Sequence, residues 1–187
     1  MIALGAAVPA VARTLDTPSA PADRAGRAGF SLIVDLSDRK LYAMEGGEVT
    51  GTYPVAIGQA RHPTPKGNFS VRRIVWNPRW VPPDAAWARG KRIREPGDPR
   101  NPMGRVKIFF LPPDYYIHGT RDVDSLGEAE SHGCVRMANS DVIAVAKRVM
   151  EHGGAPRDPT WFQRVMNRVR SSSEVRLSDP VPVQVRE

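Results

Sequence analysis

The sequence predicts a mainly β fold with one principal helix. The 187 residues include 18 prolines and 16 glycines, residue types that interrupt helices and populate turns. Short apolar runs of strand length recur between residues 30 and 119, whereas helical spacing of apolar residues is clear only after residue 138. A length of 187 residues fits one folded domain, and 41% hydrophobic residues are enough for a real core.

The first three predicted strands follow one another closely. Residues 30–36, FSLIVDL, form an apolar run suited to a buried strand, and SDRK turns the chain. Residues 41–44, LYAM, return as a second strand, and the turn EGGE leads into a third strand at residues 49–58.

A long irregular segment divides the next three predicted strands. Residues 68–76 form the fourth strand, and residues 77–104 follow as a loop rich in Pro, Arg and Trp. Loops of this length are uncommon in compact domains unless they are functional. Residues 105–111 and 115–119 are two further strands, separated by PPD.

The principal helix is predicted at residues 139–154. Asn139 or Ser140 is the expected N-cap, an apolar stripe follows, and two glycines end the helix. The stripe consists of Val142, Val145, Ala146 and Val149. A short second helix is predicted at residues 159–169, with Pro159 near its start, and a broken strand at residues 174–185.

The first 29 residues read as a separate segment. Residues 2–8 form a short apolar run, and AVA at 10–12 fits a signal-peptidase site, although the basic region of a signal peptide is missing. The remainder is an Ala/Pro/Asp/Arg-rich flexible linker. We therefore expect a signal-like remnant and flexible linker at 1–29, a folded domain at 30–187, and export to the periplasm or cell envelope. No stretch reaches the roughly 20 apolar residues of a transmembrane helix.

The chain is strongly basic, with a net charge of +7 and a pI near 10.1. Such a balance suits an anionic partner, such as nucleic acid, membrane lipid or an acidic cell-wall polymer, or only a solvated basic surface. No zinc-finger spacing, aromatic RNA-binding signature or basic heptad helix is present, so nucleic acid is not an expected partner. The sequence leaves the oligomeric state open.

The only cysteine, Cys134, is the candidate nucleophile. A lone cysteine is usually a small buried hydrophobe, but this one follows Ser-His-Gly in a loop, and Gly133 permits unusual backbone angles. A thiol attacks as a thiolate and needs a base within about 3 Å. His118, at the end of an apolar strand, is the expected base because a separate strand can aim it independently. His132, two residues from the cysteine, is expected to shape the site.

A zinc site is the inorganic alternative. His118, His132 and Cys134 are suitable ligand types, but no Asp or Glu stands at an established zinc-motif spacing. We therefore predict no metal and no cofactor.

These residues resemble the L,D-transpeptidase (YkuD-type) catalytic domain. That family carries a His followed, after a gap, by Ser/Thr-His-Gly-Cys, and here IHGT precedes SHGCVRM. VDLSDRKLYAMEGGEV resembles the family's opening hairpin, and YPVAIGQARHPTPKGNFSV its Pro-Thr-Pro-x-Gly-x-Phe segment. NPRWVPP, PGDPRNPMGRVKIFF and LSDPVPVQV also have counterparts, so the similarity covers about residues 30–185.

The resemblance implies a fold and a set of roles. The fold would be an L,D-transpeptidase-like β-sandwich or mixed sheets, with the principal helix after the cysteine loop. Cys134 would be the acylated nucleophile, His118 its base, and the carbonyl of Gly119 would orient the imidazole. The amides of Gly133 and Cys134 would contribute to the oxyanion hole, with His132 and Ser131 beside it. Arg136 would bind a substrate carboxylate or form a structural ion pair.

The implied activity is acyl transfer between peptidoglycan stem peptides. A Cys134 thioester would form on a donor tetrapeptide and pass to an acceptor stem, giving a 3→3 cross-link. Water as the acceptor would make the enzyme an L,D-carboxypeptidase, and a lipoprotein lysine would make it an anchoring enzyme. A metal-dependent hydrolase and a non-catalytic wall-binding module are the readings outside this class.

Overall fold

The computed structural model describes residues 29–187, so the linker predicted for residues 1–29 lies, except for its last residue, outside the described part. The strands are β1 Phe30–Asp35, β2 Lys40–Glu45, β3 Glu48–Pro54, β4 Gly67–Trp76, β5 Val106–Leu111, β6 Tyr115–Thr120, β7 Val135–Ala138 and β8 Ser173–Arg186. The helices are α1 Asn139–His152 and α2 Pro159–Asn167, with a 3₁₀ turn at Ala86–Ala88. The predicted mainly β fold, its principal helix and its short second helix are confirmed.

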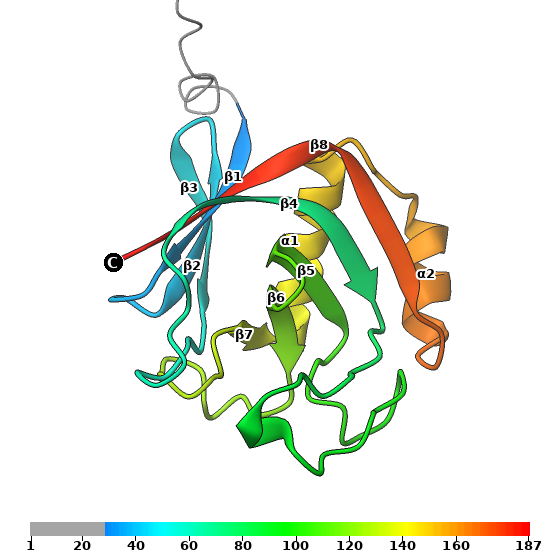
Figure 1. The fold of residues 1–187 in the computed structure, drawn as a ribbon. Coiled ribbons are helices and arrows are strands. Elements are labelled where there is room, and N and C mark those ends of the chain that lie inside the picture. Colours follow the sequence, from blue (N-terminus) through cyan, green and yellow to red (C-terminus); the bar gives the residue numbers. More distant parts are fainter. Residues whose placement is uncertain (1–28) are drawn as a thin grey trace, which may run out of the picture.

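The strands form one continuous mixed sheet in the order β3-β2-β1-β8-β4-β5-β6-β7. Long strand β8 lies at its centre, parallel to β1 and antiparallel to β4 (Figure 1). Strands β6 and β7 are the other parallel pair, and the sequence between them contains the cysteine loop. The sheet therefore consists of an N-terminal three-stranded part and a β4–β7 part, joined through β8.

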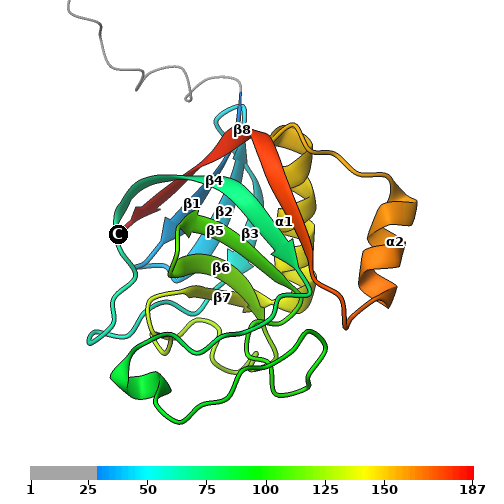
Figure 2. The same cartoon turned by 45° about the vertical axis from the view of Figure 1, so that its right-hand side comes forward.

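Helix α1 lies in the curve of the sheet and covers its apolar face (Figure 2). The predicted stripe of valines and Ala146 is fully buried against strands from both parts of the sheet. The far end of α1 also reaches the first hairpin: His152 stacks on Phe30, and Arg148 Nη2 lies 2.9 Å from Glu45 Oε2. One helix thus connects the two parts of the sheet.

The start of α1 differs from the prediction. The N-cap is Ala138, and no side chain caps the helix, so neither Asn139 nor Ser140 has the predicted role. Instead, Asn139 Oδ1 accepts from the Arg105 amide at 2.8 Å, and its Nδ2 donates to the Thr120 carbonyl at 2.9 Å. The side-chain amide of Asn139 thus joins the start of β5 and the end of β6 to the helix.

Two strands also differ from the prediction. Strand β7 was not predicted, because its four residues are too short to show a period. The C-terminal strand is continuous, although its register with β4 jumps between Arg176 and Val181, at the stretch that contains Pro180. There the main chain turns to α1 instead, where the Asp179 amide donates to the Gly153 carbonyl at 3.1 Å. The predicted break is thus an interruption of the pairing between β8 and β4, whereas the strand itself continues.

Candidate active site

The candidate base and nucleophile lie on neighbouring strands. His118 belongs to β6, and Cys134 immediately precedes β7, whose Val135 pairs with Ile117 in parallel register. Both side chains line one open cavity of about 830 Å³. The structure therefore brings together the two residues that the sequence selected from separate segments.

The cavity has walls from three parts of the chain. Its floor consists of β4–β6 side chains, its rim includes the cysteine loop, and its opposite side comes from residues 79–103 of the long irregular segment. The lining residues that bear on the chemistry are Arg73, Lys107, Tyr116, His118, His132, Cys134 and Arg136.

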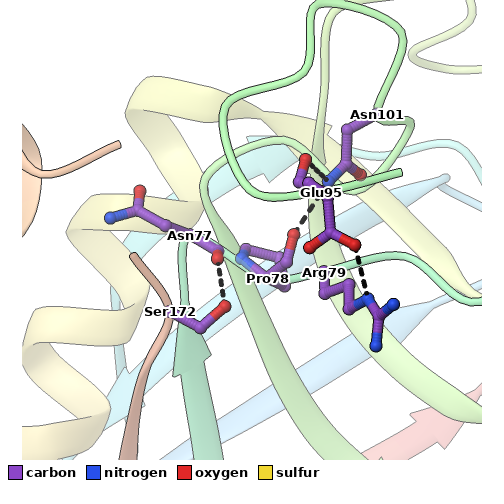
Figure 3. A network of polar contacts seen from close by, with 6 residues as sticks. All are labelled: Asn77, Pro78, Arg79, Glu95, Asn101 and Ser172. Carbon is purple, nitrogen blue, oxygen red and sulfur yellow. Dashed lines mark hydrogen bonds and ion pairs between the residues drawn. The ribbon is translucent and has the colours of Figure 1, made fainter. Parts of the chain in front are cut away.

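Polar contacts hold the long segment in place at its ends (Figure 3). Asn101 Nδ2 donates to the carbonyls of Pro78 at 2.8 Å and Glu95 at 3.2 Å, which ties the return of the segment to its start. Arg79 Nε donates to Glu95 Oε1 at 2.9 Å, and Ser172 Oγ donates to the Asn77 carbonyl at 2.7 Å. The cavity wall is thus attached to the sheet and to β8.

The imidazole of His118 is buried, with 3% of its surface exposed. Its Nδ1 lies 2.8 Å from the Gly119 carbonyl oxygen, so Nδ1 carries the proton and Nε2 keeps its lone pair. Burial lowers the pKa of His118 to about 3, and the positive charges of Arg136 and Lys107 act in the same direction. The ring is therefore neutral near pH 7 and able to accept a proton.

The thiol of Cys134 is half-buried, and its Sγ donates to the Asp114 carbonyl at 3.3 Å. Burial raises the pKa of Cys134 above its usual value. Hydrogen bonds from the main chain and side chain of Tyr116 oppose this shift, as do the charges of Lys107 and Arg136. The unliganded site thus contains a neutral thiol beside a neutral imidazole.

Ser131 holds the cysteine loop together. Its hydroxyl, 1% exposed as a residue, donates to the Cys134 carbonyl and accepts from the Gly133 amide at 3.1 Å. Gly133 has a φ of +102°, and a Cβ there would lie 2.8 Å from Tyr115 Cε1. The Gly133 amide, which the resemblance assigns to the oxyanion hole, is therefore directed at Ser131 in this state.

Residues 55–59 brace the same loop from the other side. Ala56 and Arg136 exchange both main-chain hydrogen bonds, at 3.0 and 2.9 Å. The Ser131 amide donates to the Ile57 carbonyl at 2.9 Å, and the Gln59 amide donates to the Ser131 carbonyl at 3.0 Å. Residues 55–58 of this segment were predicted as part of the third strand, but β3 ends at Pro54, because the chain leaves β2 to pair with the cysteine loop.

His132 lies at the rim of the cavity rather than beside His118, the candidate base. Its ring stacks on Trp87 of the long segment at a centroid distance of 4.0 Å and lies 5.1 Å from the ring of His62. Lys91 Nζ lies 4.9 Å from the centroid of the Trp87 ring. The stack links the cysteine loop to the long segment.

Arg136 is half-buried, and its Nη1 lies 3.7 Å from Asp122 Oδ2. This long ion pair matches the structural alternative left open for Arg136, although the side chain also lines the cavity.

Sequence reasoning missed Lys107 and Tyr116. Lys107 interrupts an otherwise apolar run, VKIFFL, and that interruption was the available signal. Tyr116 offered none, because an aromatic residue in a strand usually belongs to the core.

Within residues 29–187, no group of three or more His, Cys, Asp or Glu side chains is arranged to hold a metal ion. The same part of the chain contains no helix with the length and apolarity needed to cross a membrane.

Comparison with known proteins gives a consistent family. The family pattern described as YkuD, L,D-transpeptidase catalytic domain, matches residues 29–183. The provisionally named L,D-transpeptidase YkuD of Bacillus licheniformis is 32% identical over 120 residues, covering 64% of this chain and 60% of that protein. YqjB of Bacillus subtilis, named in the same way, is 36% identical over 117 residues, covering 60% and 61%. The chain thus spans about three fifths of the length of these relatives.

Solved structures share the fold. An L,D-transpeptidase from Mycobacterium smegmatis superposes with a TM-score of 0.53 at 16% identity, covering 86% of this chain and 59% of that one. L,D-transpeptidase 3 from Mycobacterium tuberculosis, in complex with a faropenem-derived adduct, gives a TM-score of 0.53 at 17% identity, covering 85% and 60%.

Proposed function

Because this chain belongs to the L,D-transpeptidase catalytic-domain family, we propose that it is a Cys134-dependent acyltransferase acting on peptidoglycan stem peptides. The observation that carries the proposal is the shared cavity of Cys134 and a buried, neutral His118 whose Nδ1 is engaged by Gly119. A neutral imidazole with a free Nε2 is what a general base for a thiol requires.

The first half of the reaction forms a thioester. Cys134 Sγ attacks the carbonyl of the amide between the L-centre of a diamino acid and the terminal D-Ala, and the thiol proton passes to His118 Nε2. Because both groups are neutral before attack, the thiol must give up its proton to His118 for the sulfur to attack. Collapse of the tetrahedral intermediate breaks the C–N bond, and His118 returns the proton to the leaving D-Ala amine.

The second half resolves the thioester. An amine of a neighbouring stem attacks the acyl carbon, His118 takes its proton, and Cys134 leaves as a thiol, giving a 3→3 cross-link. Water in place of the amine gives a tripeptide and an L,D-carboxypeptidase, whereas a lipoprotein lysine gives an anchored protein. The segment of residues 77–104 forms the wall of the cavity and is the proposed determinant of this choice.

The charge of the cavity supports an anionic substrate. Its lining includes Arg73, Arg79, Lys91, Lys107 and Arg136 but only two acids, Asp84 and Asp114. Stem peptides carry free carboxylates, and a cationic cleft concentrates such ligands. The proposed site of action is therefore the peptidoglycan of the cell envelope.

A covalent probe tests the function. L,D-transpeptidase 3 from M. tuberculosis carries a faropenem-derived adduct, so this β-lactam is a suitable acylating agent, as is a carbapenem. Incubation with faropenem should add one adduct to the intact mass of the wild-type protein, and Cys134→Ala should remain unmodified. The reaction should proceed equally in excess EDTA, which separates a thiol enzyme from a metal-dependent hydrolase. A wild-type protein left unmodified by both β-lactams would contradict the proposed function.

A further inference from the structure

Lys107 lies in the floor of the cavity, directly across from the candidate base. In the antiparallel β5–β6 register Lys107 pairs with His118, so the two side chains point to the same face of the sheet. Lys107 Nζ lies 4.4 Å from the centroid of the Tyr116 ring, the residue that also hydrogen-bonds the sulfur. A cation is thus held on the strand next to His118, beside the nucleophile.

The charge of Lys107 is not neutralised by a neighbouring acid. Among residues 29–187, Lys107 forms no ion pair within 4.0 Å, whereas Arg73 lies 3.5 Å from Glu174 and Arg136 lies 3.7 Å from Asp122. The Arg73 guanidinium also stacks on the Phe109 ring at 3.8 Å. Burying an unpaired cation is costly, so its retention points to an anion that forms at this place.

Ionisation of the Cys134 thiol creates one such anion. Burial lowers the pKa of Lys107 to about 8, and the charge of Cys134 acts against that shift. The same charge on Lys107 lowers the pKa of the thiol. His118 cannot supply a positive charge until it has taken a proton, because its own pKa is near 3.

We propose that Lys107 is a positioning residue whose ammonium stabilises the ionised sulfur of Cys134, while His118 only carries the proton. A single imidazolium would both carry the thiol proton and stabilise the charge of the sulfur. Here these two roles are divided between His118 on β6 and Lys107 on β5. Near pH 7, below its pKa of about 8, Lys107 keeps its three protons, and the thiol proton passes to His118 or to solvent. The ionisation of the thiol does not depend on the proposed substrate, but its importance for acyl transfer rests on the proposed function.

Other charged and titratable groups line the same cavity, and a test must hold them constant. They come from β4 through β7 and their loops: Arg73, Asp114, Tyr116, His118, His132 and Arg136. Only Lys107 combines a place on this floor with the absence of an acidic partner in the described chain. Replacing Lys107 alone therefore isolates its charge.

The experiment measures thiol ionisation directly. Cys134 is the only cysteine, so alkylation of the intact protein by iodoacetamide, a neutral reagent, reports this sulfur alone. In Lys107→Met the alkylation rate should fall below pH 8, where Lys107 of the wild-type protein carries its charge. At pH 7 the rate should fall by about tenfold, the effect of losing a unit charge a few ångströms away. The profiles should converge at high pH, where the thiol is ionised in both proteins.

Two further variants make the result specific. Lys107→Arg keeps the positive charge and should restore most of the alkylation rate at pH 7. Lys147→Met is the matched control, because Lys147 Nζ also lies over an aromatic ring, Phe162 at 4.9 Å, but on the exposed face of α1. It should leave the profile unchanged. Thermal unfolding of each variant checks that the fold is retained, and Lys107→Gln replaces the Met variant if that one does not fold.

An unchanged pH profile in a folded, uncharged Lys107 variant would overturn the inference. So would a Lys107→Arg protein that alkylates as slowly as Lys107→Met. These outcomes are independent of the proposed function, which fails instead if the wild-type protein with its Lys107 intact forms no β-lactam adduct.

Discussion

At the scale of single residues, the cysteine loop depends on backbone geometry as much as on side chains. Ser131 fixes the loop from within, and Gly133 occupies a backbone conformation that residues with a Cβ rarely adopt. Cys134, the proposed nucleophile, is therefore positioned by the two residues that flank His132.

Gly133→Ala should abolish faropenem acylation and lower the free energy of unfolding by about 1–3 kcal/mol, the cost of a strained backbone. The added Cβ would also meet Tyr115 Cε1 at 2.8 Å, so the loop must shift the sulfur. Adduct formation by intact mass and chemical denaturation measure the two effects.

Gly127→Ala is the matched control, because Gly127 has a φ of +90° with nothing near its Cβ position. It should destabilise the protein through backbone strain but leave acylation almost unchanged. Equal loss of acylation in both variants would contradict a specific role for Gly133.

The sequence predicted some of these residues and not others, for a physical reason. Cys134 and His118 stand out by residue type and by their glycine neighbours, so each can be recognised as a candidate from its local sequence alone. Lys107 can be recognised as a candidate site residue only from the strand register that places it opposite His118. Such a register is not encoded by any local pattern.

At the scale of elements, helix α1 is fixed to the sheet by a side chain that was predicted to cap it. Asn139 bonds both the Arg105 amide and the Thr120 carbonyl, next to Gly119 within β6 and Gly104 just before β5. The carbonyl that orients His118 belongs to Gly119, whose Cβ position is occupied by Asn139 Oδ1.

Asn139→Ala should therefore destabilise the protein by about 1–3 kcal/mol, because it leaves a main-chain donor and a main-chain acceptor without partners. It should also slow β-lactam acylation by loosening Gly119. Ser140→Ala is the comparison, since the Ser140 hydroxyl contacts only the exposed Asp141 carboxylate and should change stability by less than about 0.5 kcal/mol. If the two variants are equally stable, Asn139 does not have this role.

Local pattern predicted most elements well, because runs of apolar residues of strand length and a four-residue stripe carry their own period. It failed where an element is defined by its partner. Strand β7 pairs with β6 on one side and with Ala56 on the other, and this pairing, rather than any propensity of VRMA, makes it a strand. The brace at residues 55–59 was assigned to β3 for the same reason.

At the scale of the whole molecule, burial of a neutral His118 predicts how stability changes with pH. The pKa of His118 is about 3 in the folded protein and 6.5 in its unperturbed state, so between these values only the unfolded chain binds the proton. Stability is then lost as pH falls below 6.5, at up to about 1.4 kcal/mol per pH unit.

Denaturant unfolding between pH 7 and pH 4.5 measures this slope, and His118→Asn should flatten it. The lowered pKa of His132 has the same sign, so some slope should remain in the variant. The lowered pKa of Asp35, caused mainly by hydrogen bonds from the Asp38 amide and the Ser37 hydroxyl, acts at more acidic pH, below 3.8. A slope that is identical with and without His118 would mean that the imidazole is protonated in the folded protein.

The central place of β8 has a consequence for biosynthesis. The ribosome makes β8 after the other seven strands, yet β1 and β4 have no other link in the sheet than β8. Until β8 is made, β1 and β4 lack their shared neighbour in the sheet, so each of the two groups of strands has an open edge. The sheet is therefore completed only when β8 pairs with both groups.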